Sequence, residues 1–282
     1  MTNEQSLPIV VGVDGSPDSG FALDWATAEA RLRGAPLYAV YGLWMPMAAV
    51  PFGGAAVLPP SDELRAYATQ VLDAARQRAK ETAPDLDVDT FLVLRPPAQA
   101  LLDVAKDAGL VVAGTRGLGA IGSLVLGSVS SRVAAHAGCP AVVVPPHEGT
   151  GDGSIVVGVD GSAHGDAALR FALTEAGVRS ARVVVAGAFR MRGPTAAPER
   201  GETEELVEAA LGRARATTGA TVEVTTVVEP GDAADVIVEA AADAALVVVG
   251  SRGRGDVRSM LLGSTSRAVL HQAARPVAIV HG

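Results

Sequence analysis

Gly114-Thr115-Arg116-Gly117 is followed, after nine residues, by Gly127-Ser128, and the pattern recurs as Gly250-Ser251-Arg252-Gly253, nine residues and Gly263-Ser264. A run of four apolar residues precedes each copy, which is typical of a buried strand that ends in a loop. Small hydroxyl residues follow each copy and open a helical pattern. Each unit is therefore predicted to be a strand, a glycine loop and a helix N-terminus. Such a unit offers backbone N–H groups and the positive end of a helix dipole to an anion.

A second repeat shows that the duplication reaches beyond this motif. The octapeptide IVVGVDGS, which begins at Ile9, recurs letter for letter from Ile155. The offset between the copies is 146 residues here and 136 residues at the glycine pattern. A shorter loop in the second half, near residues 190–198, would account for the difference. Two copies of one unit of ~140 residues indicate a duplicated domain rather than a solenoid.

Both halves alternate strand-like and helix-like segments. In the first half we expect strands at 9–14, 37–41, 88–94, 110–114 and 141–144, helices at 16–34, 61–82, 98–108 and 128–137, and a loop at 42–60. In the second half we expect strands from Ile155 and at 182–189, 221–228, 246–250 and 277–280, with a long helix at 202–217. This alternation predicts the α/β class, as two tandem Rossmann-like domains, each a five-stranded parallel sheet with helices on both faces. The predicted domains are residues 1–146 and 154–282, joined by a glycine-rich linker at 147–153.

The composition limits the class of protein. Hydrophobic residues make up 49% of the 282 residues and charged residues 19%, so packed cores are expected and extended disorder is not. The net charge of −8 argues against a non-specific nucleic-acid binder. Cys139 is the single cysteine, so no intrachain disulfide can form, and we interpret it as a small buried residue at a strand start. No stretch reaches the ~18 apolar residues of a membrane span, and the first residues lack a secretion signal, so we expect a soluble, cytoplasmic protein.

Two acidic residues are predicted to face the glycine loops. Asp14 and Gly114 both stand at the carboxyl ends of predicted strands, and Asp160 and Gly250 repeat the arrangement. Ligands of open α/β sheets bind beyond the carboxyl ends of the strands, at a topological switch point. If the strands concerned are neighbours, each aspartate shares one cleft with its glycine loop.

Other motifs favour structural interpretations. Residues 117–122 match the spacing of a dinucleotide-binding fingerprint, but they follow the fourth strand rather than the first, and the second half does not repeat them. Ser16 and Ser162 are interpreted as helix caps rather than nucleophiles, because no base lies at motif distance. His136 and His271 are interpreted as capping residues late in their helices, and no histidine stands at metal-ligand spacing.

The first strand with Asp14, the duplicated glycine pattern and the small-hydroxyl helix start resemble the universal stress protein family. The resemblance covers nearly the whole chain as two tandem domains, like the tandem forms found in actinobacteria, and the glycine pattern is similar to that of the ATP-binding branch. It implies an α/β fold of five parallel strands and one ATP in each domain. Any Mg²⁺ that accompanies the ATP would lie near Asp14 and Asp160.

The resemblance also implies roles for the matching residues. Asp14 would lie beside the nucleoside, Gly42 would offer its backbone to adenine, and Gly114 and Gly117 would line the ribose and phosphates. The phosphates of the first site would be held by Gly127, Ser128, Val129 and Ser130. The matching residues of the second half are Asp160, Ala188, Gly250, Gly253, Gly263, Ser264, Thr265 and Ser266. Unequal affinities are expected, because the second nine-residue spacer carries Arg254, Asp256 and Arg258 where the first is apolar.

Three functions remain open. The leading hypothesis is an ATP-binding regulator of a stress or dormancy response, whose nucleotide state alters its contacts with a partner protein. The second is a slow ATPase or another nucleotide-using enzyme of this fold class, although residues 14–19 lack the double glycine that such enzymes usually carry there. The third is a structural dimerisation module with vestigial sites. No catalytic residue is assigned. The last strands of the two halves are expected to pair in an intrachain pseudo-dimer, and the resemblance implies a homodimer of whole chains.

Overall fold

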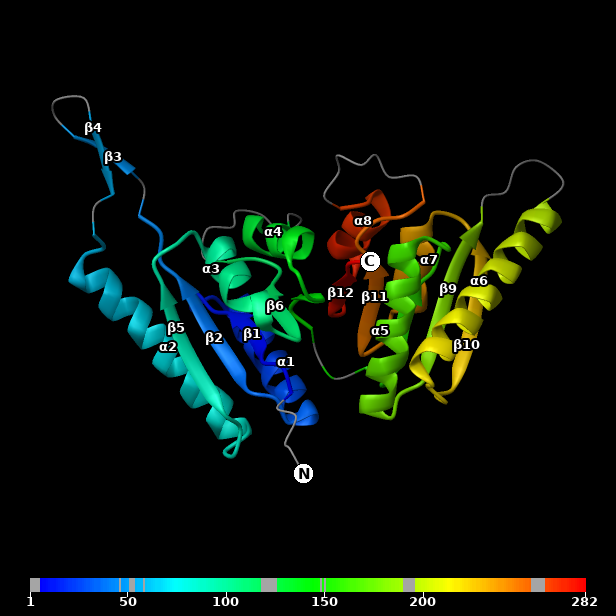
Figure 1. The fold of residues 1–282 in the computed structure, drawn as a ribbon, viewed down its shortest axis with the longest axis horizontal. Coiled ribbons are helices and arrows are strands. Elements are labelled where there is room, and N and C mark those ends of the chain that lie inside the picture. Colours follow the sequence, from blue (N-terminus) through cyan, green and yellow to red (C-terminus); the bar gives the residue numbers. More distant parts are fainter. Residues whose placement is uncertain are drawn as a thin grey trace. The chain divides into compact units, whose positions relative to one another are not determined.

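The computed structural model of the protein describes residues 6–45, 47–50, 54–57, 59–117, 126–147, 149, 151–189, 196–254 and 262–282. The chain forms two compact units, which comprise Met1–Cys139 and Pro140–Gly282. Both units alternate strands and helices along the chain (Figure 1).

Unit 1 contains four parallel strands in the order β6-β1-β2-β5. These strands are β1 (Ile9–Gly12), β2 (Leu37–Gly42), β5 (Val88–Val93) and β6 (Leu110–Gly114). Ile9 pairs with Leu37 on one side and with Leu110 on the other, and all three side chains are fully or almost fully buried. The strands read as continuous apolar runs because helices cover both faces of a parallel sheet.

The helices of unit 1 form two layers. The helices are α1 (Pro17–Arg33), α2 (Asp62–Thr82), α3 (Pro97–Val104) and α4 (Ser128–His136). On one face α1 packs on β1 and β6 while α2 packs on β2 and β5, and on the other face α3 and α4 contact each other and the sheet. The long helix predicted at 98–108 is shorter than expected, because a 3₁₀ turn, η1 (Ala105–Asp107), replaces its last part.

The loop predicted at 42–60 is wrong in part. Residues Met47–Val50 and Gly54–Val57 form strands β3 and β4, which pair antiparallel as a separate two-stranded sheet. The proline and glycine content of this stretch is typical of a loop, but the short runs between those residues are apolar and can satisfy their backbone groups by pairing with each other. Residues 190–195, which follow the corresponding strand of unit 2, lie outside the described residues.

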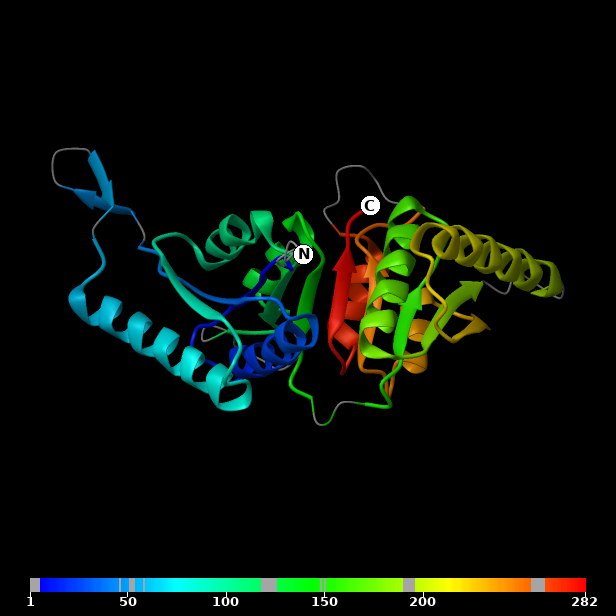
Figure 2. The ribbon, with the colours of Figure 1, turned by 60° about the horizontal axis from the view of Figure 1, so that its bottom comes forward.

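Unit 2 repeats the fold with two additional strands in its sheet. Five parallel strands lie in the order β10-β9-β8-β11-β12, and a sixth strand, β7, pairs with β12. The strands are β7 (Ala141–Val144), β8 (Ile155–Gly158), β9 (Val183–Phe189), β10 (Val224–Pro230), β11 (Leu246–Gly250) and β12 (Val277–Val280). The helices are α5 (Ala163–Arg179), α6 (Ala196–Thr218), α7 (Ala233–Ala240) and α8 (Ser264–Gln272). In this unit α5 and α6 pack together on one face, and α7 and α8 pack together on the other (Figure 2).

The predicted α/β class, with parallel strands and helices on both faces, is confirmed in both units. The exception within the parallel arrangement is β7, which the sequence pattern places at the end of the first domain. It belongs to unit 2, where Val143 pairs with Val277 of β12 in antiparallel register. All four β7 residues are buried. The predicted bounds of the domains and of the linker stay a prediction.

Cys139 precedes β7 and has the structural setting that its sequence position indicates. Its thiol is half-buried, and its Sγ lies 3.8 Å from the carbonyl oxygen of Ala105. Burial raises the pKa of the thiol to about 11, so the group stays protonated at neutral pH. Within the described part of the chain, none of the helices has the length and apolar character that crossing a bilayer requires.

Candidate functional site

The strand order brings each aspartate next to its glycine loop. In unit 1, β1 pairs with β6, and the two strands end side by side just before Asp14 and at Gly114. In unit 2, β8 pairs with β11 in the same way, and Asp160 and Gly250 occupy the corresponding places. The carboxyl ends of these central strands therefore carry both elements that the sequence pattern indicates, at the place where open α/β sheets bind their ligands.

A cavity opens at this end of unit 1. Its volume is about 390 Å³, and the residues of the first predicted site all line it. They are Asp14, Gly42, Gly114, Gly117, Gly127, Ser128, Val129 and Ser130. Segments separated by more than a hundred residues in the chain thus converge on one cavity.

Unit 2 has a larger cavity at the equivalent place. Its volume is about 540 Å³, and the eight residues of the second predicted site line it. They are Asp160, Ala188, Gly250, Gly253, Gly263, Ser264, Thr265 and Ser266. Arg252 and Arg254 also line this cavity, whereas Asp256 and Arg258 lie outside the described residues.

The glycine loops pass directly against the aspartates. A side chain at Gly117 would place its Cβ 2.5 Å from Asp14 Oδ2, and a Cβ at Gly253 would lie 2.8 Å from Asp160 Oδ2. Both distances are shorter than real Cβ contacts, so only glycine fits at these two positions without a shift of the loop or of the carboxylate.

Backbone N–H groups hold both carboxylates in place. Asp14 Oδ1 accepts a hydrogen bond of 2.9 Å from the N–H of Ser16, and Asp160 Oδ1 accepts one of 3.0 Å from the N–H of Ser162. Asp160 Oδ2 also accepts from the N–H of Arg254, at 3.0 Å, which ties the carboxylate to the second glycine loop. Asp160 thus joins the start of α5 to the glycine loop that precedes α8.

Helices α4 and α8 begin at the cavities. Their N-cap residues are Gly127 and Gly263, and among the described residues neither N-terminus has a side-chain cap hydrogen bond. By contrast, Ser16 caps α1 and Ser162 caps α5 through their hydroxyl oxygens, which confirms the interpretation of these serines as helix caps. The N–H groups of an uncapped first turn need another acceptor, and together with the helix dipole they form a site for an anion.

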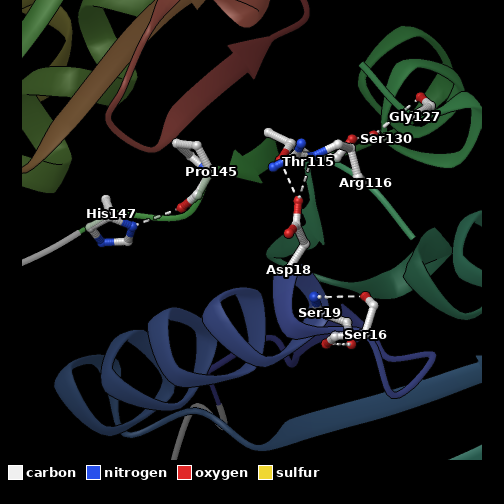
Figure 3. Close-up of polar contacts among 9 residues, drawn as sticks. All are labelled: Ser16, Asp18, Ser19, Thr115, Arg116, Gly127, Ser130, Pro145 and His147. Carbon is white, nitrogen blue, oxygen red and sulfur yellow. Dashed lines mark hydrogen bonds and ion pairs between the residues drawn. The ribbon is translucent and has the colours of Figure 1, made fainter. Parts of the chain in front are cut away.

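The serines in these first turns do not fill the place of a cap. The Ser130 hydroxyl donates to the carbonyl oxygen of Thr115, at 2.9 Å, and the Ser266 hydroxyl donates to the carbonyl oxygen of Gly250, at 2.7 Å. Each hydroxyl therefore ties its helix to the preceding loop and leaves the helix terminus open to the cavity. Figure 3 shows the Ser130 side of this arrangement.

An ion pair closes one side of the first cavity. Asp18, in the first turn of α1, accepts hydrogen bonds from Thr115 Oγ1 at 2.8 Å and from Arg116 Nε at 3.1 Å (Figure 3). The Asp18 side chain is only 13% exposed, so the contact is partly shielded from solvent. The charge of Arg116, which lines the cavity, is therefore already balanced by a neighbouring carboxylate.

Histidine replaces this carboxylate in the second unit. His164 occupies the place of Asp18, and its Nδ1 accepts from the backbone N–H of Gly282 at 2.8 Å. The hydroxyl of Ser251 lies 3.1 Å from the same nitrogen. Arg252, the counterpart of Arg116, has a buried Nε with no hydrogen-bond partner within the described parts of the chain.

The wall opposite the glycine loops is apolar. In unit 1 it includes Val40, Gly42, Pro97 and Leu101. A Cβ at Gly42 would lie 2.5 Å from Pro97 Cα, so the close approach of α3 requires glycine there, whatever the ligand. Unit 2 has Ala186, Ala188, Ala233 and Ile237 at the equivalent places. Flat apolar walls of this kind suit an aromatic ring.

The residues of α3 and α7 in these walls are absent from the predicted sites. Pro97 and Ala233 follow the third strand of their units, so the rule that ligands bind at carboxyl ends could have placed them there. Tyr41 also lines the cavity of unit 1, although the predicted site does not include it, and Gly187 stands at the equivalent position in unit 2. Burial above all, together with Tyr67 and Asp14, raises the pKa of Tyr41 above its ordinary value, so its hydroxyl stays protonated.

No metal centre is built into the described parts of the chain, since they contain no group of three or more metal-ligating side chains. His136 bonds back to the carbonyl oxygen of Arg132 in its own helix, at 2.9 Å, and is exposed. Each cavity therefore offers an uncapped helix, a glycine loop that lies against a carboxylate, and an apolar wall. A ligand with one ring and a string of anionic groups has the matching chemistry.

Comparisons with known proteins agree with this arrangement. The model of the universal stress protein family matches residues 7–145 and again residues 153–281. Universal stress proteins of Mycobacterium tuberculosis and of Mycolicibacterium smegmatis are each 34% identical to this chain, over 294 and 282 residues, and both matches cover 96% of each chain. A solved universal stress protein from Archaeoglobus fulgidus has the same fold, with a TM-score of 0.71 at 18% identity over 98% of this chain and 97% of that chain. The chain therefore belongs to the universal stress protein family, as a tandem member with two family domains.

Proposed function

We propose that each half of this protein binds one ATP and that the bound nucleotide regulates contacts with a protein partner in a stress or dormancy response. The observation that carries the proposal is the pairing, in both units, of an uncapped helix N-terminus with a glycine loop that passes directly against a carboxylate in one cavity. The same combination occurs twice in one chain, although neither fold nor helix stability requires a helix to begin without a cap.

The residues present fit the groups of an adenine nucleotide. The apolar walls would receive the base, with the backbone at Gly42 and Ala188 beside it, and Asp14 and Asp160 would face the nucleoside. The glycine loops would lie along the ribose and the phosphates. The phosphates would accept hydrogen bonds from the N–H groups of the two helix N-termini. These are Ser128, Val129 and Ser130 in the first site and Ser264, Thr265 and Ser266 in the second.

We propose that Mg²⁺ enters with the nucleotide rather than binding to the protein first. Each cavity offers one aspartate, and in Asp160 both oxygens already accept backbone hydrogen bonds. A magnesium ion usually keeps several waters and binds through one or two carboxylates together with the phosphates of its substrate. Asp14 and Asp160 are the residues that would meet such an ion.

Calorimetry on protein stripped of nucleotide is expected to show two ATP sites per chain. Adenosine and inorganic triphosphate, titrated separately, should each bind more weakly than ATP, because each fills only part of the cavity. Mass spectrometry of ligand released from freshly purified protein would identify the natural occupant. Folded, stripped protein that binds none of the three ligands would contradict the proposal.

The regulatory role would follow from differential binding. A ligand shifts a conformational equilibrium only by its difference in affinity for the two states. We propose that whole chains pair as a homodimer and that ATP changes the exposed surface or the pairing. Sedimentation velocity of the full chain, with and without saturating ATP, is expected to show a dimer whose shape or association constant depends on ATP. Identical profiles of a monomer under both conditions would contradict this part of the proposal.

A further inference from the structure

The two units differ at the position that holds the carboxylate partner of Arg116 in unit 1. Asp18 and His164 occupy equivalent places in the first turns of α1 and α5, at the offset of 146 residues that relates the two octapeptides. Arg116 and Arg252 are equivalent in the glycine loops, and each lines its cavity. Arg116 therefore has a carboxylate partner, whereas the position that corresponds to this carboxylate in the second unit carries an imidazole.

We infer that this exchange makes the second site selective for the phosphate charge of its nucleotide, while the first site discriminates little between ATP and AMP. The inference rests on the proposed nucleotide binding and goes beyond it by assigning the selectivity to the residue pair Asp18 and His164. The reason is that the positive charge of Arg116 is balanced by a neighbouring carboxylate, whereas that of Arg252 remains available to a ligand.

In the first site the positive charge of Arg116 is already balanced by Asp18. Arg116 Nε donates to Asp18 Oδ2 at 3.1 Å, and Thr115 donates to the same oxygen at 2.8 Å (Figure 3). A phosphate that approached Arg116 would compete with this carboxylate and would also be repelled by it. With Asp14 in the same cavity, these three ionised groups sum to one negative charge. Additional phosphate charge therefore gains little attraction from these side chains.

In the second site the imidazole does not compete for the arginine. The N–H of Gly282 can only donate, so His164 Nδ1 is the acceptor in this contact. An imidazole, unlike a carboxylate, has no negative charge with which to hold Arg252. The buried Nε of Arg252 accordingly has no hydrogen-bond partner within the described residues. A buried donor on a charged group is unfavourable until it finds an acceptor, and a phosphate oxygen is the acceptor that the proposed ligand supplies.

The surroundings of the second cavity strengthen this difference. Arg254 lines it as well, and the equivalent position in the first half is Leu118. Arg254 also borders a neighbouring groove together with Glu202 and Glu205, so part of its charge is offset there. The expected selectivity therefore depends mainly on Arg252. A guanidinium with an open donor gains most from a ligand that has the most negative charge within its reach.

The test measures the ratio of AMP to ATP dissociation constants at each site alone. Gly253→Glu leaves the first site, and Gly117→Glu leaves the second, because a carboxylate then enters the other loop. Calorimetry is expected to give a ratio at least about tenfold larger at the second site, which is the usual size of one charge-assisted phosphate contact.

Exchange of the residue pair should then transfer the selectivity. In the Gly253→Glu background, Asp18→His and Asp18→Asn are both expected to raise the AMP-to-ATP ratio of the first site, since both release Arg116 from a negative charge. Asn retains an oxygen acceptor for Thr115, so agreement between the two variants identifies charge as the cause. In the Gly117→Glu background, His164→Asp should lower the ratio of the second site.

The outcomes separate this inference from the proposed function. If neither isolated site binds any of the nucleotides, the proposed function is wrong and the inference falls with it. If both sites bind ATP with equal AMP-to-ATP ratios, or if Asp18→Asn leaves the ratio of the first site unchanged while circular dichroism shows a folded chain, the inference alone is overturned.

Discussion

Gly117→Glu is expected to lower the number of ATP molecules bound per chain from two to one, with the second site unaffected. The Cβ of any residue at position 117 would lie 2.5 Å from Asp14 Oδ2, so the loop or the carboxylate must move. Glutamate adds a negative charge where the phosphates would lie, and like charges in a partly desolvated site repel strongly. Steric and electrostatic effects therefore act in the same direction, and the loss of affinity should exceed ~100-fold, or roughly 3 kcal/mol.

Matched controls separate the effect of position from the effect of a new glutamate. Gly138→Glu introduces the same residue in unit 1 at an exposed position where a Cβ would meet no atom within 4 Å. It should retain both binding sites. The reciprocal variant Gly253→Glu should remove the second site alone, and Gly177→Glu, where a Cβ again meets nothing within 4 Å, is its control. Two full equivalents of ATP bound to Gly117→Glu would mean that the phosphates lie elsewhere.

The sequence predicts the central part of each site because local signals and the geometry of parallel sheets agree there. Apolar runs mark the buried strands, and the rule that ligands bind at carboxyl ends converts a one-dimensional pattern into a shared cleft. Asp14 and Gly114 are a hundred residues apart in the chain, yet their neighbouring strands make them adjacent. The exact duplication adds weight, since a chance pair of turns would not recur in both halves.

Contacts between a helix start and a distant loop lay beyond this reasoning. Asp18 and Thr115 are separated by 97 residues, and nothing in the glycine pattern indicates that these two side chains meet. Their contact depends on how closely α1 packs on β6, which no local pattern encodes. The pairing of β7 with β12 agrees with the expected pairing of the last strands of the two halves, although the strand pattern alone does not reveal its direction, because a buried apolar strand looks the same in either direction.

The hairpin of β3 and β4 was missed because composition and pairing conflict. Proline and glycine in this stretch favour a loop, whereas two short apolar runs can still pair with each other. Residue propensities alone therefore do not decide between a loop and a pair of strands. A sequence with no charged, hydroxyl or amide side chain between Leu43 and Pro60 was nevertheless a signal that this stretch is more than a solvated loop.

ATP bound to this protein is expected to be hydrolysed very slowly or not at all. Fast phosphoryl transfer needs charge neutralisation at the γ-phosphate and a positioned nucleophile. The only two lysines of the chain are placed elsewhere: Lys80 Nζ donates to the carbonyl oxygen of Pro84, at 3.2 Å, and Lys106 Nζ pairs with Asp103, at 3.1 Å. Among the described residues that line the two cavities there is no histidine and no glutamate to orient a water molecule.

The groups that are present would stabilise the bound substrate rather than its transition state. Backbone N–H groups at a helix N-terminus bind phosphate in the ground state, and binding of substrate and transition state to the same degree does not accelerate chemistry. Single-turnover release of phosphate from bound radiolabelled ATP should therefore be slower than ~10⁻³ s⁻¹, against the ~1–10³ s⁻¹ of ordinary enzymes. The double variant Gly117→Glu/Gly253→Glu is the control for contaminating ATPase. Phosphate release within seconds in the unmodified chain, lost in the double variant, would place this protein among the enzymes, because the phosphate would then come from these two sites.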